Sequence, residues 1–282
     1  FIREVTTAGD GACADGVAWG RLPAFRHHIL DLHHDIEESG LPVAPPALGL
    51  AACEAAVRGL RGPRILLFAT HGYYCSPSPT AATGAVPALS GGDRGHAASG
   101  AHPLLRSGLI LAGGNSLPPL LRKPDLPFAE LARIAANDGN LTALEVSSLD
   151  LQGTDLVSLV ACETGLGDIE AGVGVAGLRS AFQIAGARSV QMSLFEVPVM
   201  LMDEADRAAL AAAGTPVADA ITFNSAFYRN WLAAGDRPMK KLNAHHQAQL
   251  EVLRAARANP IATLASGHPF WWGAYVLIGD PN

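Results

Sequence analysis

Two short runs of apolar residues and a third predicted strand constrain the fold of this chain more than any other feature. The apolar runs lie at residues 64–70 and 155–161, and the third strand is predicted at residues 188–195. A continuous apolar run of this length is typical of a strand that is buried on both faces of a sheet. Segments with helical spacing separate the runs, and this alternation favours an α/β fold with a mostly parallel sheet. Right-handed crossovers then predict helices on both faces of that sheet.

The rest of the sequence predicts the elements around these strands. Helical spacing or Ala-rich composition predicts helices at residues 22–40, 47–60, 126–136, 172–185, 203–213, 216–234 and 239–258. Further short strands are expected at 108–112 and 275–278, and a helical turn at 142–149. Residues 73–101 are rich in Pro, Ser, Gly and Ala and predict a long surface loop. Residues 1–21 are expected to be irregular.

The length of 282 residues, with no linker that splits the chain, predicts a single domain over residues 1–282. Hydrophobic residues make up 49% of the chain and charged residues 16%, which is too apolar for a disordered protein. The formal net charge of −6 argues against a direct nucleic-acid partner, because phosphate contacts need a basic surface. The uncharged stretch at 73–92 contains too much Pro, Ser and Gly for a membrane helix, so no membrane partner is expected.

The cysteines and the first residue suggest a setting for the chain. Its 4 cysteines include no CxxC pair, so they do not form a disulfide framework, and a reducing, cytoplasmic location is expected. The chain starts with Phe1 and shows no signal peptide, and we read it as a fragment of a larger protein. No cofactor and no metal are expected.

Two residues with nucleophile and base chemistry follow the two apolar runs. His71 comes after the run at 64–70, and Cys162 comes after the run at 155–161. Ligands bind beyond the carboxyl ends of the strands in such sheets, and a nearby histidine can activate a cysteine thiol. The alternative is that Cys162 is an inert buried thiol and His71 a structural residue. The residues alone leave both interpretations open.

Three other patterns are weaker. His27 and His34 share one helix face and could hold a metal, but a solvated or interface face is the better interpretation, as it is for the pair at 245–246. The Gly172-x-Gly174-x-x-Gly177 pattern opens a predicted helix and is similar to a dinucleotide-binding motif. It lacks the preceding strand and the later acidic residue of that motif, so helix–sheet packing explains it better.

An ordered series of motifs covers residues 60–282 and resembles a known family. The series is Ala69-Thr70-His71-Gly72, the segment 102–113 (HPLLRSGLILAG), Leu141-Thr142-Ala143-Leu144-Glu145-Val146, the segment 149–157 (LDLQGTDLV), Ala161-Cys162-Glu163-Thr164-Gly165, the segments 172–178 and 185–190, and 268–280 (HPFWWGAYVLIGD). It is similar to the CHAT family, caspase-like cysteine peptidases of the separase/caspase clan. The resemblance implies a three-layer caspase-like sandwich.

The same resemblance implies a mechanism and a site. The family's catalytic pair falls on His71 and Cys162, which implies a cysteine endopeptidase that forms a thioester with a protein substrate. The backbone N–H groups of Gly72 and Cys162 would form the oxyanion hole. No third catalytic residue is evident, so we expect a dyad.

The resemblance also implies that substrate preference depends on the position two before the cysteine, because this side chain lines the first specificity pocket in caspase-like enzymes. This position is Val160, where the family commonly has Ser, and an apolar wall favours an uncharged residue before the cleaved bond. A basic preference would need a carboxylate from elsewhere, and the candidates are Asp93, Glu196 and Asp203.

The expected partners are a protein substrate and a regulatory sensor or repeat segment, in the same or another polypeptide. The main alternative function is a catalytically silent interaction module on the same caspase-like scaffold. A nucleotide-binding protein is the weakest alternative, because it depends on the glycine pattern alone.

Overall fold

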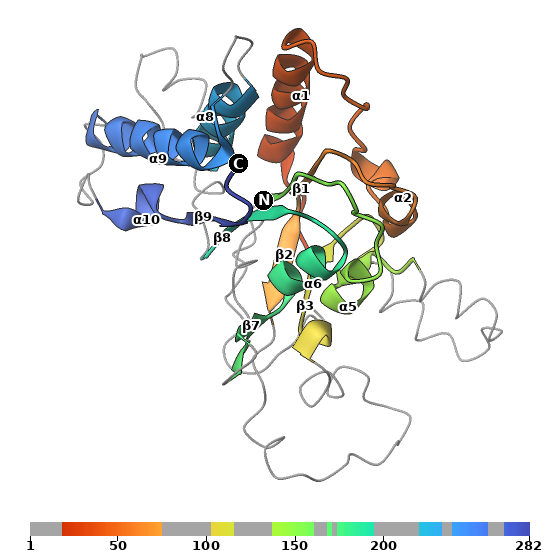
Figure 1. The fold of residues 1–282 in the computed structure, drawn as a ribbon. Helices are drawn as coiled ribbons and strands as arrows, with labels where there is room; N and C mark the ends of the chain where they lie inside the picture. The colour runs from red at the N-terminus through yellow and green to blue at the C-terminus, as the bar shows by residue number, and fades with distance from the viewer. Residues whose placement is uncertain are drawn as a thin grey trace, which may run out of the picture.

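The three predicted buried strands form one sheet in the computed structural model, which describes residues 19–74, 103–115, 137–160, 168–170, 174–194, 220–232, 239–258 and 268–282. The sheet order is β1-β5-β8-β9, with β1 Ile65–Ala69, β5 Leu156–Val160, β8 Ser189–Ser193 and β9 Tyr275–Gly279. Figure 1 labels β1, β8 and β9 of this sheet. Strands β1, β5 and β8 are parallel, and β9 is antiparallel to β8. The mostly parallel sheet is therefore confirmed.

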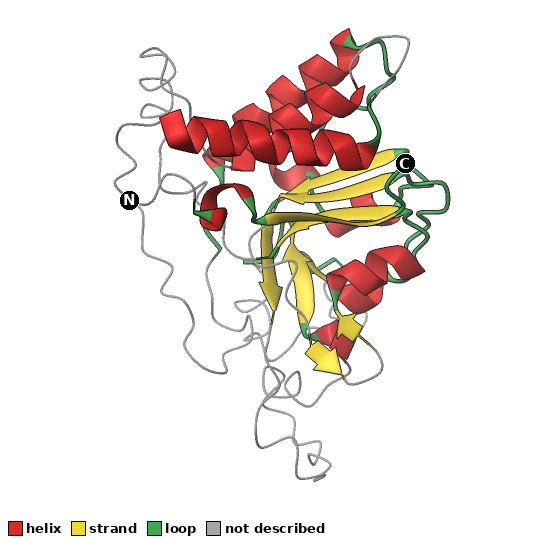
Figure 2. Ribbon diagram, turned by 60° about the vertical axis from the view of Figure 1, so that its left-hand side comes forward, coloured by secondary structure: helices red, strands yellow, loops and turns green. Residues whose placement is uncertain are grey.

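Helices cover both faces of this sheet, as predicted. One face packs against α1 (Pro23–Glu38), α8 (Ala220–Leu232) and α9 (Lys241–Ala258), and the other against α2 (Glu54–Arg58), α5 (Ala143–Val146) and α6 (Leu178–Ile184). Figure 2 shows the strands between the two helix layers. In β5, Leu156 and Val160 belong to the first apolar cluster, while Val157 and Leu159 belong to the second. Successive strand residues point to opposite faces, and the result is a three-layer α/β/α sandwich.

A second, antiparallel sheet begins directly after β1, and the apolar runs did not predict it. Its order is β2-β3-β4, with β2 His71–Tyr74, β3 Ser107–Ile110 and β4 Asn140–Thr142. The chain leaves the first sheet at Thr70, whose hydroxyl donates a hydrogen bond to the Ile110 carbonyl. The prediction of a loop from residue 73 is therefore wrong for residues 73–74, which belong to β2. Residues 75–101 of that predicted loop lie outside the described part.

Two predicted helices are shorter in the structure. The helix expected at 47–60 is interrupted, because a 3-10 turn (η1, Gly49–Ala51) ends before α2 begins at Glu54. The helix expected at 172–185 is wrong in its first half, where β7 (Gly174–Ala176) pairs with β6 (Asp168–Glu170). The helix that the glycine pattern precedes begins at Leu178, directly after the last glycine of the pattern, Gly177.

The remaining predicted elements divide into confirmed ones and ones that the structure does not describe. The turn at 142–149 is confirmed as α5, where Thr142 and Glu145 form a capping box. The helix expected at 216–234 is confirmed over Ala220–Leu232 as α8, and short turns η4 (Pro103–Leu105) and α10 (Pro269–Trp272) complete the described elements. The helices expected at 126–136 and 203–213 lie outside the described residues. Within the described residues, no helix is long and apolar enough to cross a membrane.

His245 is buried, which corrects the prediction that the pair at 245–246 forms a solvated or interface face. Its side chain is 5% exposed, and its Nε2 lies 3.2 Å from the Tyr275 carbonyl oxygen of β9. Burial lowers the pKa of His245 to about 4, so the ring is neutral at physiological pH. The reason is that α9 packs this part of its surface against the sheet.

Candidate active site

His71 lies where the chain passes from the first sheet to the second. It is the first residue of β2, two positions beyond the end of β1, and its side chain is half-buried. The backbone pairs His71 with Ile110 and Gly72 with Leu109 of β3. Both predicted residues of this segment therefore lie at the carboxyl end of β1, where a parallel sheet places its ligands.

A backbone carbonyl fixes the imidazole of His71. The His71 Nε2 lies 2.8 Å from the carbonyl oxygen of Gly20. A carbonyl oxygen only accepts hydrogen bonds, so Nε2 carries the proton in this contact. In the neutral ring, Nδ1 then holds the free lone pair and is the nitrogen that can accept a proton. This arrangement suits a general base.

The segment before α1 covers His71 through aromatic and polar contacts. The ring of Trp19 lies 5.3 Å from the His71 ring and 6.5 Å from the Tyr73 ring, measured between centroids. The side chain of Asn115 binds the backbone of Trp19 twice, because its Oδ1 accepts from the Trp19 N–H and its Nδ2 donates to the Trp19 carbonyl, each at 2.9 Å. The Tyr73 hydroxyl donates to Asn140 Oδ1 at 2.8 Å.

The described residues include only some of the predicted site. Val160 is the last residue of β5, directly opposite Ala69 of β1, and its side chain is 1% exposed within the core. The predicted nucleophile and the candidate specificity carboxylates lie outside the described residues, and they are Cys162, Asp93, Glu196 and Asp203. The structure thus places the histidine, its glycine neighbour and the last residue of β5.

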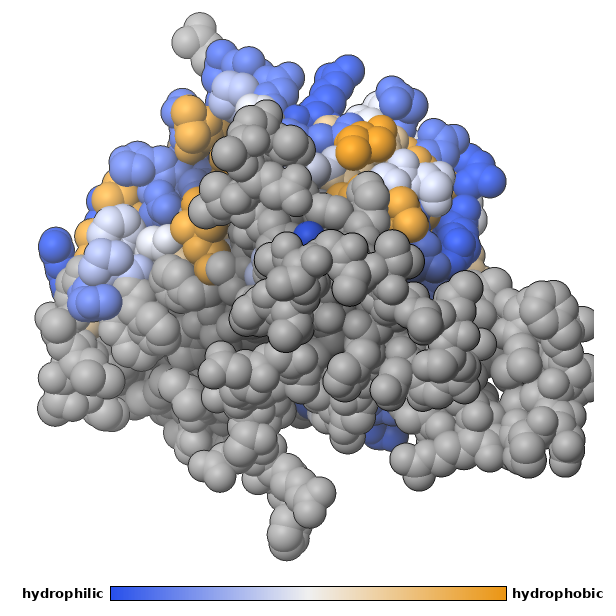
Figure 3. Space-filling view, turned by 90° about the horizontal axis from the view of Figure 1, so that it is seen from below, coloured by the Kyte–Doolittle hydropathy of each residue, from blue (hydrophilic) through white to orange (hydrophobic). Residues whose placement is uncertain are grey.

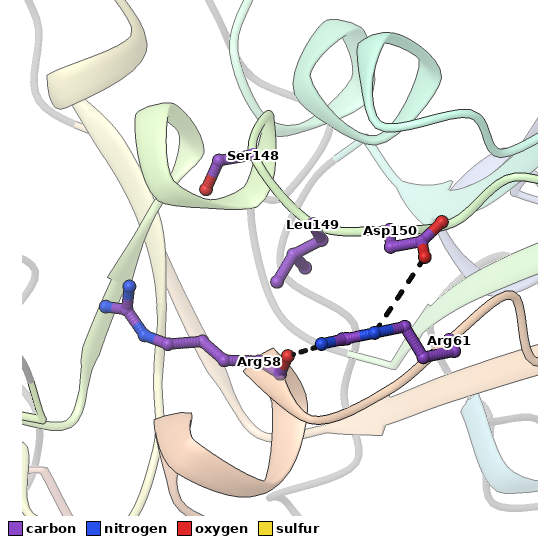
Figure 4. Close-up of a pocket in the computed structure, with 5 residues that line it drawn as sticks. All are labelled: Arg58, Arg61, Ser148, Leu149 and Asp150. Atoms are coloured by element: carbon purple, nitrogen blue, oxygen red, sulfur yellow. Dashed lines mark hydrogen bonds and ion pairs between the residues drawn. The ribbon is translucent and has the colours of Figure 1, made fainter.

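A pocket lies between the segments that lead into β1 and β5, far along the strands from His71. Its lining includes Arg58, Arg61 and Asp150 (Figure 4). Both guanidinium groups already have partners: Arg58 binds Glu54 at 2.7 Å and Glu145 at 3.0 Å. Arg61 donates to the Arg58 carbonyl at 2.9 Å and lies 3.9 Å from the Asp150 carboxylate. These arginines therefore offer little free positive charge to an anionic ligand.

Metal-ligating side chains do not converge in the described part of the chain. No group of three or more His, Cys, Asp or Glu residues there could hold a metal ion. On α1, the His34 Nε2 lies 3.4 Å from Glu38 Oε1, and the His33 Nδ1 lies 3.9 Å from Glu37 Oε2. These are i,i+4 contacts along one helix.

Sequence reasoning did not find the groups that hold His71. Gly20 acts through its backbone carbonyl, which leaves no signature in the residue type. Asn115 lies 96 positions from Trp19, and its role depends on the second sheet, which the apolar pattern did not predict. The sequence signal for these contacts was Trp19 next to Gly20, because a large aromatic residue in a segment expected to be irregular indicates a packing contact.

Comparison with known proteins identifies the family of this chain. The model of the CHAT domain matches residues 4–280, which is nearly the whole chain. A search of curated proteins found no match. CHAT is a caspase-like family, and the three-layer sandwich with a mostly parallel sheet is consistent with a caspase-like fold. The chain belongs to the CHAT domain family.

Proposed function

We propose that this protein is a cysteine endopeptidase in which His71 and Cys162 form the catalytic dyad. The observation that carries the proposal is the register of the parallel strands. Residue pairs of β1 and β5 differ by 91 positions, as Ala69 and Val160 do, and His71 and Cys162 are also 91 positions apart. Both residues therefore follow their strands by the same number of positions. This supports a meeting of the two side chains beyond the shared sheet edge.

The Gly20 carbonyl binds Nε2 of His71 and leaves Nδ1 available, so Nδ1 is the nitrogen that acts in the dyad. The Nδ1 of His71 accepts the thiol proton of Cys162, and the thiolate sulfur attacks the carbonyl carbon of the substrate peptide bond. The imidazolium then gives its Nδ1 proton to the leaving amine nitrogen as the carbon–nitrogen bond breaks. Water hydrolyses the thioester, with Nδ1 accepting the water proton and returning it to the sulfur. Throughout, the Nε2–H can donate to the Gly20 carbonyl and stabilise the positive ring.

The oxyanion hole proposed for this dyad consists of the backbone N–H groups of Gly72 and Cys162. Gly72 follows His71 in β2 and has no side chain to obstruct an approaching carbonyl group. Donors aimed at the developing oxyanion contribute about 3 kcal/mol each to transition-state stabilisation in comparable enzymes.

We further propose that the residue before the cleaved bond is uncharged. Val160 offers neither charge nor hydrogen bond at the end of β5, and its side chain lies within the core, so it supplies no partner for a basic head, whose unpaired burial would be costly. The competing prediction is a requirement for Arg or Lys, met by a carboxylate of Asp93, Glu196 or Asp203. A peptide library varied at this position decides between the two, because only the second predicts loss of basic preference when one carboxylate is changed.

The substrate is proposed to be a protein, and control by a sensor or repeat segment stays a prediction. The alternative of a silent interaction module would need a docking surface. On the face drawn in Figure 3, the apolar residues of the described part lie in separate groups among hydrophilic residues. The large exposed apolar side chains also come from different elements, such as Leu50 in η1 and Ile184 on α6. The described part of this face therefore shows no single large apolar patch.

The test compares Cys162→Ala and His71→Ala with the wild-type chain on a proteome-derived peptide library. Each substitution should lower cleavage by at least ~10³-fold, because the members of a catalytic unit act together. Cys53→Ala is the matched control, since Cys53 is a half-buried free thiol that precedes α2. Its cleavage should equal that of the wild type. Retained cleavage in Cys162→Ala, with all variants folded, would show that the proposal is wrong.

A further inference from the structure

We propose that Asn115 is a positioning residue for His71, acting through the backbone of Trp19 and Gly20. The proposal rests on the function proposed above, because it assumes that His71 is the catalytic base. Asn115 itself does not touch the imidazole. Its carboxamide holds the segment whose carbonyl oxygen accepts the Nε2–H of His71.

The contact between Asn115 and Trp19 uses both halves of the carboxamide. One oxygen accepts from the Trp19 N–H and one nitrogen donates to the Trp19 carbonyl, each at 2.9 Å. An asparagine thereby replaces the two hydrogen bonds that a neighbouring strand would supply. An aspartate at this position could accept but not donate, and its charge would face the Trp19 carbonyl oxygen. The geometry thus selects a side-chain amide.

The segment needs such a holder because no regular element contains it. Trp19 and Gly20 precede α1 and belong to no helix or strand, so no ladder of backbone hydrogen bonds fixes them. The Trp19 ring contacts the rings of His71 and Tyr73, which restrains the segment from one side. The carboxamide of Asn115 restrains its backbone. Together these contacts set the position of the next carbonyl, that of Gly20.

Asn115 is itself held by a tightly packed turn. The Leu111 N–H donates to the Gly139 carbonyl at 2.7 Å, and the Gly114 N–H donates to the Leu111 carbonyl at 3.1 Å. A Cβ atom on Gly139 would lie 2.1 Å from the Gly114 nitrogen, so the two backbones touch. The Gly139 N–H donates in turn to Oε1 of Glu54, which is fully buried, at 2.7 Å. The turn that carries Asn115 is therefore anchored in the core.

Loss of the Asn115 contact should release the Gly20 carbonyl from His71. The imidazole would then exchange between its two neutral tautomers, and only one of them leaves Nδ1 free to accept a proton. The imidazolium that pairs with the Cys162 thiolate would also lose a hydrogen-bond acceptor. We therefore expect the pKa of the Cys162 thiol to rise and its alkylation at neutral pH to slow by about tenfold in Asn115→Ala.

The experiment compares Asn115→Ala, Asn115→Asp and Asn115→Gln in the full chain, with Asn137→Ala as the matched control. Asn137 is also exposed and accepts from a backbone N–H, that of Ala55 at 3.2 Å, but it does not touch the segment at 19–20. Two readouts are used for each variant. Imidazole ¹⁵N chemical shifts report the His71 tautomer, with its signals assigned by their loss in His71→Gln. The pH profile of iodoacetamide labelling reports the Cys162 thiol.

The proposal predicts an Nε2–H tautomer in the wild type and a tautomer mixture in Asn115→Ala and Asn115→Asp. It also predicts recovery in Asn115→Gln, which restores donor and acceptor, and no change in Asn137→Ala. Unchanged His71 shifts in Asn115→Ala would overturn it, and so would an equal change in Asn137→Ala. If His71→Ala leaves the labelling profile of Cys162 unchanged, the dyad fails instead, whatever the tautomer shows. The two failures are therefore distinguishable.

Discussion

Replacement of Gly139 by alanine tests the packing that supports the site. Gly139 has a φ of +82°, a conformation that costs a residue with a side chain about 1–2 kcal/mol. Its Cβ would lie 2.1 Å from the Gly114 nitrogen and 2.5 Å from the Gly113 carbonyl carbon. Backbone atoms cannot rotate away as a side chain can, so the turn must shift. Such overpacking costs about 1–3 kcal/mol more.

Gly153→Ala is the matched control for this substitution. Gly153 has a φ of +88°, and a Cβ there would meet nothing within 4 Å. Its cost is therefore the backbone strain alone. We expect Gly139→Ala to lower the free energy of unfolding by about 2–5 kcal/mol and Gly153→Ala by about 1–2 kcal/mol. The difference isolates the clash with the turn that carries Asn115.

Equilibrium unfolding in urea measures both losses of stability, and iodoacetamide labelling of Cys162 measures the effect on the site. Gly139→Ala should slow the labelling, because the displaced turn releases the contact with Trp19, whereas Gly153→Ala should not. Equal losses of stability in the two variants would refute the packing argument. Unchanged labelling in a destabilised but folded Gly139→Ala would refute its link to the site.

Two further predictions concern buried charges. Lys241 is fully buried, and its Nζ donates to the Asp155 carboxylate and the Ser189 hydroxyl, each at 2.9 Å. Lys241→Met should therefore lower the free energy of unfolding by about 2–4 kcal/mol, whereas Lys240→Met, at the exposed neighbour, should lower it by less than about 0.5 kcal/mol. Similar thermal melting of the two variants would contradict this prediction. Burial, aided by nearby carboxylates, raises the pKa of Asp138 to about 6, so its contribution to stability rises as the pH falls through 6 and is complete below its unfolded pKa near 4. Asp138→Asn should therefore be more stable than the wild type by about 1–2 kcal/mol at pH 8 and lose this advantage progressively between pH 6 and pH 4, and a difference that does not depend on pH would contradict the assignment.

The central sheet could be predicted because β1 and β5 are short and largely apolar on both faces. In β5 every residue is buried, and the run at 155–161 contains all five of them. The closeness of the carboxyl ends of β1 and β5 was also predictable, because the strands of a parallel sheet end at the same edge. The antiparallel position of β9 could not be predicted, because periodicity gives the existence of a strand and not its direction.

The second sheet could not be predicted for a different reason. His71-Gly72-Tyr73-Tyr74 contains no apolar run, and these half-buried positions of β2 form a strand only because β3 pairs with them. The same dependence on tertiary contacts explains the overextended helix at 172–185. Ala176 has a high helix propensity and Gly174 a low one, and pairing with β6 makes both part of a strand.

The predicted histidine and its glycine neighbour lie at the expected sheet edge because strand ends carry ligand sites in this architecture. The contacts that hold His71 join residues far apart in the sequence: His71 and Gly20 are separated by 51 positions, and Trp19 and Asn115 by 96. Their roles depend on a backbone carbonyl and on one exposed amide, and neither group has a sequence pattern. The burial of His245 was missed because its neighbour His246 is exposed on the same helix, and the sequence does not separate the two.

Labelling with a peptide that carries a thiol-reactive electrophile tests the central claim most directly. The account predicts a single adduct per chain, located on Cys162 by mass spectrometry, with Cys13, Cys53 and Cys75 unmodified over the same time. It also predicts that His71→Ala abolishes the adduct while the protein stays folded. Equal modification of all four cysteines, or full labelling of Cys162 in His71→Ala, would contradict the proposed dyad.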